Sequence, residues 1–88
     1  MSLMATRSSP PPRVLIVEDD AKIADLLANY LQAAGMTTGW CADGLQAPQR
    51  VRDEAPQLVL LDLMLPGQDG IAVCAAVRRF SAVPILML

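Results

Sequence analysis

The sequence predicts an α/β protein with a doubly wound parallel sheet, and three observations support this prediction. Segments typical of strands alternate with segments typical of amphipathic helices, in the order strand–helix–strand–helix–strand–helix–strand. Three of the strand segments are nearly solid apolar runs, as expected for parallel strands covered on both faces. The chain has 88 residues, of which 53% are hydrophobic and 18% charged, so one small packed domain is expected. Right-handed crossovers then place helices on both faces of the sheet.

The first third of the chain predicts an arm, a strand and a helix. Residues 1–12 include a Ser- and Pro-rich stretch, which predicts a disordered or extended arm, and order is expected from Arg13. Residues 14–17 are all apolar and form the first predicted strand. Asp20 can cap the following helix, and Gly35 can end it. Five apolar residues at helical spacing predict one apolar stripe on this helix: Ile23, Leu26, Leu27, Tyr30 and Leu31.

The middle of the chain predicts a short strand, a helix and a buried strand. Residues 36–41 contain two Thr and the Trp, which favours a strand. An Asp-Gly turn then begins a helix over residues 45–54. Pro48 is tolerated if it lies in the first turn of this helix, and it bends the helix if the helix begins earlier. An Ala-Pro pair ends the helix, and the apolar residues 58–61 form the third predicted strand.

The last part of the chain predicts a third helix and a fourth strand. Residues 68–70 (Gln-Asp-Gly) open the helix, and Arg78 and Arg79 suit the negative pole at its end. Residues 83–88 form the fourth strand. The apolar positions of the third helix are Ile71, Val73, Cys74 and Val77.

Acidic residues directly follow two of the predicted strands. Glu18 and Asp19 come after the first strand, and Asp62 comes after the third. Open α/β sheets bind their ligands at the carboxyl ends of strands, so these three residues are expected to share one acidic pocket. Mg²⁺ prefers oxygen ligands and commonly uses one or two carboxylates together with phosphate oxygens. A carboxylate beside bound Mg²⁺ can accept a phosphoryl group, so an aspartate of this pocket is expected to form an aspartyl phosphate.

Each acidic group also has an ordinary explanation. The acidic run at residues 18–20 can complement the N-terminus of a helix, and Asp62 can cap a loop. The Asp-Gly pairs at Asp43 and Asp69 are most simply turns and helix starts, so Asp69 is expected outside the pocket. Only the joint pattern of strand ends and acids favours a metal site.

Composition argues against several other classes of function. The net charge is −2 and the seven Lys and Arg residues are scattered, so these residues are not expected to bind nucleic acid. No apolar stretch approaches the roughly 20 residues of a membrane span, and the first residues lack the features of a signal peptide. With no His and no CxxC motif, Cys41 and Cys74 are expected to be small buried hydrophobic residues in a reducing cytoplasm.

The residues around the acids resemble the receiver domains of response regulators, the phosphoryl-accepting proteins of two-component signalling. The resemblance covers residues 13–88 and is carried by VLIVEDD at 14–20, LVLLDLMLPG at 58–67, Asp-Gly at 69–70 and VPILML at 83–88. It implies a flavodoxin-like (βα)5 receiver fold, here incomplete with strand order 2-1-3-4. The sequence around Asp62 is similar to receivers of DNA-binding transcription regulators.

The resemblance implies a role for each residue of the pocket. Asp62 would accept a phosphoryl group from a sensor histidine kinase. Asp19 and Asp62 would bind Mg²⁺ directly, together with the backbone carbonyl of Met64, and Glu18 would help through a water molecule. Such a domain is a phosphoacceptor in a cytoplasmic signalling pathway and not an enzyme with a separate substrate.

Other features of the family concern the loop after Asp62 and two side chains that follow the fourth strand. Pro66 and Gly67 would shape the loop beyond the phosphorylation site. Family members carry a Thr or Ser just after the fourth strand and a Lys at the end of a fifth strand, and this chain has neither. The chain is therefore expected to be a receiver truncated after the fourth strand, from a longer natural protein.

Alternative functions stay open at this point. Because it lacks this Thr or Ser and this Lys, the chain also fits a phosphorylation-incompetent pseudo-receiver that acts as a docking or dimerisation module. The apolar residues 85–88 would lie on an edge strand that a second copy, in a homodimer, can cover. An aspartate-nucleophile phosphatase is disfavoured, because its nucleophile follows the first strand whereas Asp62 follows the third.

Overall fold

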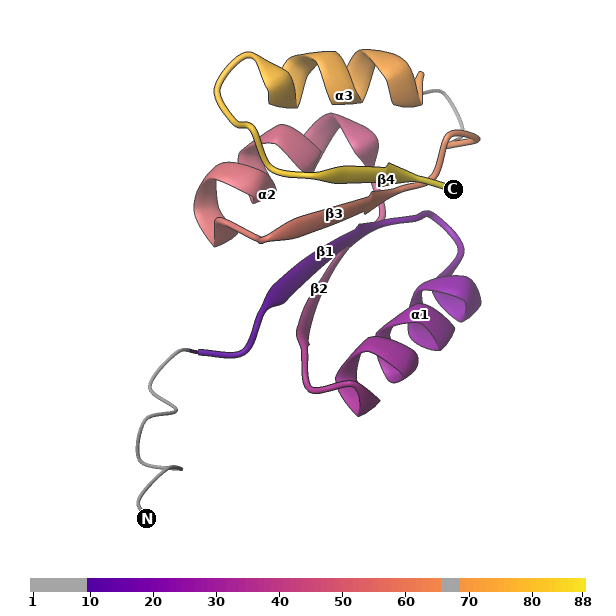
Figure 1. The fold of residues 1–88 in the computed structure, drawn as a ribbon. Coiled ribbons are helices and arrows are strands. Elements are labelled where there is room, and N and C mark those ends of the chain that lie inside the picture. Colours follow the sequence, from indigo (N-terminus) through magenta and orange to yellow (C-terminus); the bar gives the residue numbers. More distant parts are fainter. Residues whose placement is uncertain (1–9, 66–68) are drawn as a thin grey trace.

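The computed structural model describes residues 10–65 and 69–88, which form a four-stranded parallel sheet and three α-helices (Figure 1). The strand order is β2-β1-β3-β4, and all three strand pairs are parallel. The predicted fold class and order are thus confirmed. The elements are β1 (Arg13–Val17), α1 (Ala21–Ala33), β2 (Thr37–Cys41), the 3-10 helix η2 (Gly44–Gln46), α2 (Ala47–Glu54), β3 (Leu58–Leu61), α3 (Gly70–Arg78) and β4 (Ile85–Met87).

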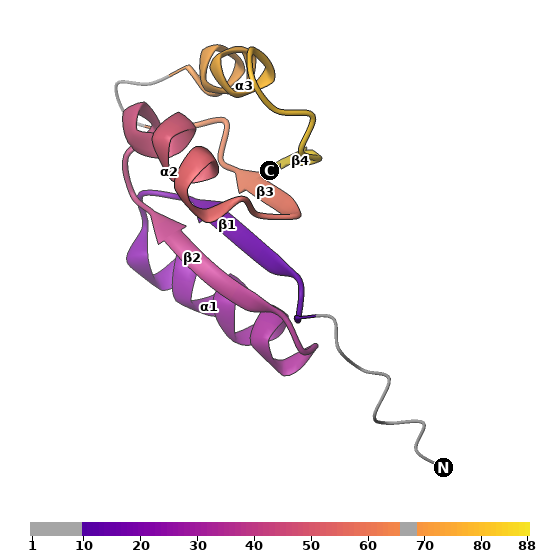
Figure 2. The same cartoon turned by 90° about the vertical axis from the view of Figure 1, so that its left-hand side faces the viewer.

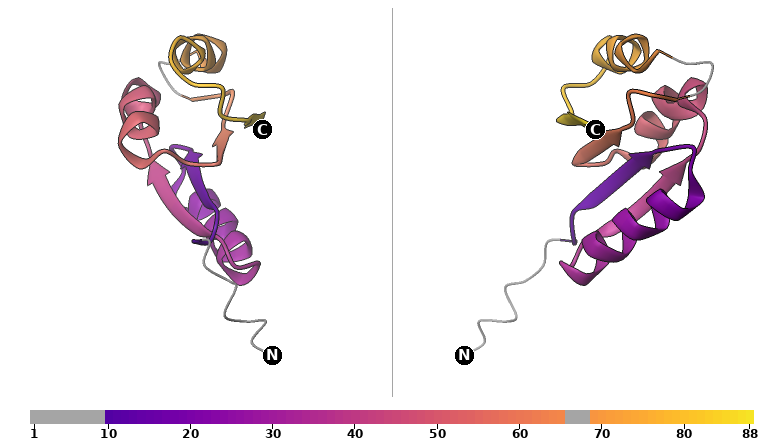
Figure 3. Two further views of the ribbon diagram at one scale, coloured as in Figure 1. Left: turned by 60° about the vertical axis from the view of Figure 1, so that its left-hand side comes forward. Right: turned by 90° about the vertical axis from the view of Figure 1, so that its right-hand side faces the viewer.

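The helices lie on both faces of the sheet, with α1 on one face and α2 and α3 on the other (Figures 2 and 3). Successive side chains of a strand point to opposite faces, so each central strand supplies two separate cores. The core beneath α2 and α3 includes Leu15, Val17, Val59, Leu61, Val51, Val73 and Val77. The core beneath α1 includes Val14, Ile16, Leu60 and Ala24. Among the described residues, no helix is both long enough and apolar enough to cross a membrane.

The face of α1 that packs on the sheet differs from the predicted stripe. Three residues of that stripe are exposed: Ile23 (45%), Leu26 (56%) and Tyr30 (72%). The other two residues of that stripe, Leu27 and Leu31, do face the sheet, together with Ala24 and Ala28. The prediction of one stripe was wrong because it left out two alanines, whose small side chains let the helix approach the sheet. Their spacing of i, i+3, i+4 and i+7 is that of one helix face.

The predicted ends of the helices are largely confirmed. Asp20 caps α1, because its Oδ1 accepts hydrogen bonds from the amides of Lys22 (2.8 Å) and Ile23 (3.3 Å). Gly35 follows the helix with φ of +91°, a left-handed conformation that glycine adopts without strain. Pro48 is the second residue of α2, where its missing N–H costs no helical hydrogen bond.

The fourth strand is shorter than predicted. It begins at Ile85 and not at residue 83, because Pro84 has no N–H to donate to the ladder. Pro84 still accepts a hydrogen bond from the Val59 amide at 2.9 Å. β4 forms one edge of the described sheet, and Leu86 and Leu88 are about half exposed there (53% and 51%).

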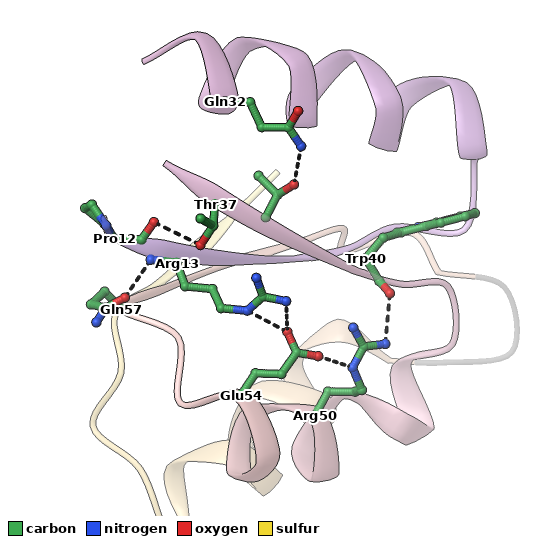
Figure 4. A network of polar contacts seen from close by, with 9 residues as sticks. Pro12, Arg13, Gln32, Thr37, Trp40, Arg50, Glu54 and Gln57 are labelled. Carbon is green, nitrogen blue, oxygen red and sulfur yellow. Dashed lines mark hydrogen bonds and ion pairs between the residues drawn. The ribbon is translucent and has the colours of Figure 1, made fainter. Parts of the chain in front are cut away.

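A polar network fastens the start of β1 to the end of α2 (Figure 4). Glu54 Oε1 accepts hydrogen bonds from Arg13 Nε (3.0 Å) and Nη2 (2.7 Å), and Glu54 Oε2 accepts one from Arg50 Nε. Arg50 also donates to the backbone carbonyl of Trp40 at 2.8 Å. The network passes over Gly39 of β2, where a Cβ would collide with Glu54 and approach Arg13 Nη2 to 2.9 Å. A larger residue at this position would make the ends of these side chains shift.

We expect Glu54→Gln to lower the free energy of unfolding by about 1 kcal/mol at neutral pH. Burial alone would raise the pKa of Glu54, but the hydrogen bonds from Arg50 and Arg13 outweigh it and lower this pKa. The stabilisation is therefore present above the ordinary pKa of 4.5 and is lost as the pH falls through the lowered value. Urea denaturation at neutral pH and at about pH 3 measures the difference.

The control for this prediction is Asp53→Asn, an exposed change on the same helix. It should change stability by no more than about 0.5 kcal/mol at either pH. A deficit of Glu54→Gln that persists unchanged in acid would show that the charge on Glu54 is not what stabilises the network.

Candidate metal centre at the carboxyl ends of the strands

Three carboxylates from two strand ends meet at the carboxyl edge of the sheet. β1 and β3 are parallel neighbours with Val17 opposite Leu61, so the residues that follow them emerge at the same level. Glu18, Asp19 and Asp62 each place one carboxylate oxygen within 4.8 Å of the others. The structure thus brings together the three acids that the sequence predicts to share a pocket.

Glu18 is the buried member of this acidic cluster, with 5% of its surface exposed. Its Oε2 accepts a hydrogen bond from the Asp20 amide at 3.1 Å. Burial raises the pKa of Glu18 above its ordinary value, and the bond from Asp20 offsets part of this rise. The carboxylates of Asp62 and Asp19 raise the pKa further, because an ionised Glu18 is repelled by its neighbours.

Asp62 is the half-buried member, and it is held by its backbone and by one carboxylate oxygen. Its amide donates to the Val17 carbonyl at 3.0 Å, which continues the pairing of β3 with β1. Asp62 Oδ1 accepts a hydrogen bond from the Met64 amide at 2.9 Å. These contacts fix the direction of the carboxylate while leaving it accessible from solvent.

Asp19 is the exposed member, and three acids outside the cluster cap helices. Asp20 caps α1, as described above. Asp43 accepts a hydrogen bond from the Leu45 amide at the start of η2, and Asp69 accepts one from the Ile71 amide at the start of α3, both at 2.9 Å. The expectation that the two Asp-Gly pairs are helix starts is confirmed. Pro66 and Gly67, predicted to shape the loop, lie outside the described residues together with Gln68.

Gly70 packs against the backbone of the cluster, a contact that the sequence pattern does not predict. A Cβ on Gly70 would lie 3.0 Å from the Cα of Leu63 and 3.4 Å from the carbonyl oxygen of Asp62. The start of α3 therefore packs directly against the backbone that carries Asp62. The Asp-Gly pair signalled only a helix start, and nothing nearby in the sequence indicated this tertiary contact.

Trp40 is a second residue near the cluster that the sequence analysis treated only as part of a strand. Its indole Nε1 donates a hydrogen bond to the backbone carbonyl of Glu18 at 2.6 Å. A single Trp at a strand end gives no signal for such a bond, because its partner lies 22 residues earlier in the chain.

The chemistry of the donor set fits a hard divalent cation. The cluster offers carboxylate oxygens and neither nitrogen nor sulfur, which matches the preference of Mg²⁺ and not that of zinc. Cys41 is buried and Cys74 is half buried, and both are free thiols outside the cluster. Within the described ranges, no other group of three or more His, Cys, Asp or Glu residues is close enough to hold a metal ion.

Comparison with known proteins identifies the family. The sequence profile of the response regulator receiver domain matches residues 14–88. The chain is 49% identical over 77 residues to the transcriptional regulatory protein BaeR of Escherichia coli O6:H1. It is 51% identical over 76 residues to the DNA-binding response regulator MtrA of Mycolicibacterium paratuberculosis. These alignments cover 88% and 86% of this chain but only 32% and 34% of the relatives, so the chain spans about a third of their length.

Solved structures agree with the sequence relatives. The BeF3-activated N-terminal receiver domain of Klebsiella pneumoniae RstA superposes with a TM-score of 0.80 at 37% identity, covering 85% of this chain and 64% of that one. The N-terminal domain of a response regulator/sensory box/GGDEF 3-domain protein from Carboxydothermus hydrogenoformans gives a TM-score of 0.80 at 32% identity, covering 85% of this chain and 62% of that one. The match in sequence and fold shows that this chain belongs to the family of response regulator receiver domains.

Proposed function

We propose that this receiver domain accepts a phosphoryl group on Asp62 from a sensor histidine kinase and thereby controls the output of a longer regulator. The observation that carries the proposal is the meeting of Glu18, Asp19 and Asp62 within 4.8 Å at the ends of β1 and β3. The curated relatives are named as DNA-binding or transcriptional regulators, which supports transcription as the output. A cytoplasmic location belongs to the same proposal.

The residues of the cluster would bind Mg²⁺ in two ways, directly and through a water molecule. Asp19 and Asp62 would be direct ligands, together with the backbone carbonyl of Met64, and Glu18 would contribute through a water molecule. Bound Mg²⁺ would neutralise negative charge on the oxygens of the transferred phosphoryl group. Its binding would also relieve the repulsion among the three carboxylates, which, after burial, raises the pKa of Glu18.

Asp62 would act as the nucleophile. A carboxylate oxygen of Asp62 forms a new bond to phosphorus, and the bond between phosphorus and the donor breaks, with the electron pair leaving on the donor. The Met64 amide holds Oδ1 at 2.9 Å and so orients the carboxylate before the donor arrives. The domain itself is the acceptor, so the product of the reaction is the phosphorylated protein.

Incubation with acetyl phosphate tests this function without the kinase. We expect intact-mass spectrometry to show one added phosphoryl group in the presence of Mg²⁺ and none when EDTA removes the metal. Absence of the phosphorylated species at saturating Mg²⁺ would contradict the proposal. Gel filtration of the same samples examines the alternative, because a dimer that takes up no phosphate would favour a docking or dimerisation module.

A further inference from the structure

We propose that Trp40 is a positioning residue for the metal centre and that its indole N–H sets the affinity of the acidic cluster for Mg²⁺. This inference rests on the proposed function, because it concerns the same three carboxylates. It assigns a role to a side chain of β2, a strand that supplies no carboxylate to the cluster.

The two peptide groups on either side of Glu18 are both tied to the end of β2. The Glu18 amide donates to the Cys41 carbonyl at 3.1 Å, and the Glu18 carbonyl accepts from Trp40 Nε1 at 2.6 Å. Figure 4 shows the indole reaching from β2 toward the connection between β1 and α1. The second of these bonds restrains the peptide that joins Glu18 to Asp19.

The other side of Asp19 is restrained by α1. The Asp20 carbonyl accepts from the Ala24 amide at 2.9 Å, and Asp20 Oδ1 accepts from the amide of Lys22. Asp19 therefore stands between one residue held by β2 and another held by the helix. Without the indole bond, the Glu18–Asp19 peptide loses one of its restraints, and the proposed metal ligands lose part of their preorganisation.

Packing does not explain the placement of Trp40. The residue is 44% exposed, and it belongs to neither of the two cores. Its backbone is anchored separately, since Arg50 donates to its carbonyl at 2.8 Å. The indole thus projects from a fixed point of β2, and its most specific contact is the bond to Glu18.

The first test is Trp40→Phe, which keeps an aromatic ring and removes the N–H. We expect the Mg²⁺ dissociation constant to rise about three- to tenfold, the range that loss of one hydrogen bond spans. A titration with MgCl₂ followed by the backbone amide NMR signals of Asp62 and Met64 measures it in the 88-residue chain.

The matched control is Thr38→Val on the same strand. Thr38 Oγ1 accepts a hydrogen bond from Gln32 Nε2 on α1 at 2.8 Å, so this change also removes a polar contact between α1 and β2. Because the contact does not involve residues 18–20, the Mg²⁺ dissociation constant should stay at the wild-type value. A change as large as that of Trp40→Phe would overturn the specific role of Trp40.

Two further measurements do not depend on how well the Phe variant folds. Replacing Trp40 by benzothienylalanine keeps the shape of the indole but exchanges the N–H for sulfur, and it should weaken Mg²⁺ binding by a similar factor. The chain has one Trp, so its indole N–H gives one unambiguous NMR signal. In the wild type this signal should shift during the MgCl₂ titration with the same dissociation constant as the Asp62 amide.

The outcomes separate this inference from the proposed function. Saturable Mg²⁺ binding in the wild type, with unchanged affinity in both Trp40 variants, would overturn the role of Trp40 and leave the metal centre intact. Absence of saturable binding in the wild type would overturn the metal centre and this inference together.

Discussion

Asp62→Asn is expected to abolish phosphoryl uptake from acetyl phosphate, lowering the rate by about a thousandfold or more. The amide oxygen of Asn carries no negative charge and does not form a stable bond to phosphorus. The side chain keeps its size and can still accept the bond from the Met64 amide, so the fold around it should persist. Intact-mass spectrometry after incubation with acetyl phosphate and Mg²⁺ measures the result.

Asp69→Asn is the matched control for this prediction. Asp69 is an exposed acid whose Oδ1 caps α3 by accepting from the Ile71 amide, and Asn caps helices about as well as Asp. This variant should take up phosphate at the wild-type rate. A phosphorylated species that persists in Asp62→Asn would mean that another residue is the acceptor.

Glu18→Gln is expected to make the metal-free chain more stable at neutral pH while weakening Mg²⁺ binding about tenfold or more. The gain should be about 0.5–2 kcal/mol, the usual size of one stabilising substitution. The raised pKa of Glu18 means that its ionisation costs stability as the pH rises through that value. Gln removes the charge, so the advantage exists at neutral pH and vanishes below the ordinary pKa of 4.5.

Thermal unfolding with EDTA and with millimolar Mg²⁺ measures both effects. Mg²⁺ should raise the melting temperature of the wild type by mass action and that of Glu18→Gln much less. Asp43→Asn is the control, since Asp43 is an exposed cap of η2 outside the cluster. It should respond to Mg²⁺ like the wild type. A metal-free Glu18→Gln that is less stable than the wild type at neutral pH would contradict the cost of ionising Glu18, which is buried beside two other acids.

Most of the fold could be predicted because its signals lie within short stretches of sequence. The apolar runs at residues 14–17 and 58–61 form the two central strands, and Asp20 caps α1 through amides two and three residues away. The meeting of Asp19 and Asp62 could also be predicted, since neighbouring parallel strands end at the same edge of a sheet.

Other features could not be predicted because they depend on which surfaces meet. One such feature is the buried face of α1, which contains Ala24 and Leu27 while Leu26 and Tyr30 are exposed. It follows from how closely the helix approaches the sheet. The need for Gly70 arises from its contact with Leu63, which no local pattern reveals.

The order of strands and helices, the caps of the helices and the identity of the acids are encoded by residues that are neighbours in the chain, so they can be predicted from local patterns. The burial of Glu18 and the hydrogen bond from Trp40 to its carbonyl are not encoded in this way. The bond joins residues 22 positions apart, and both features form only after the sheet has brought β1 and β2 together.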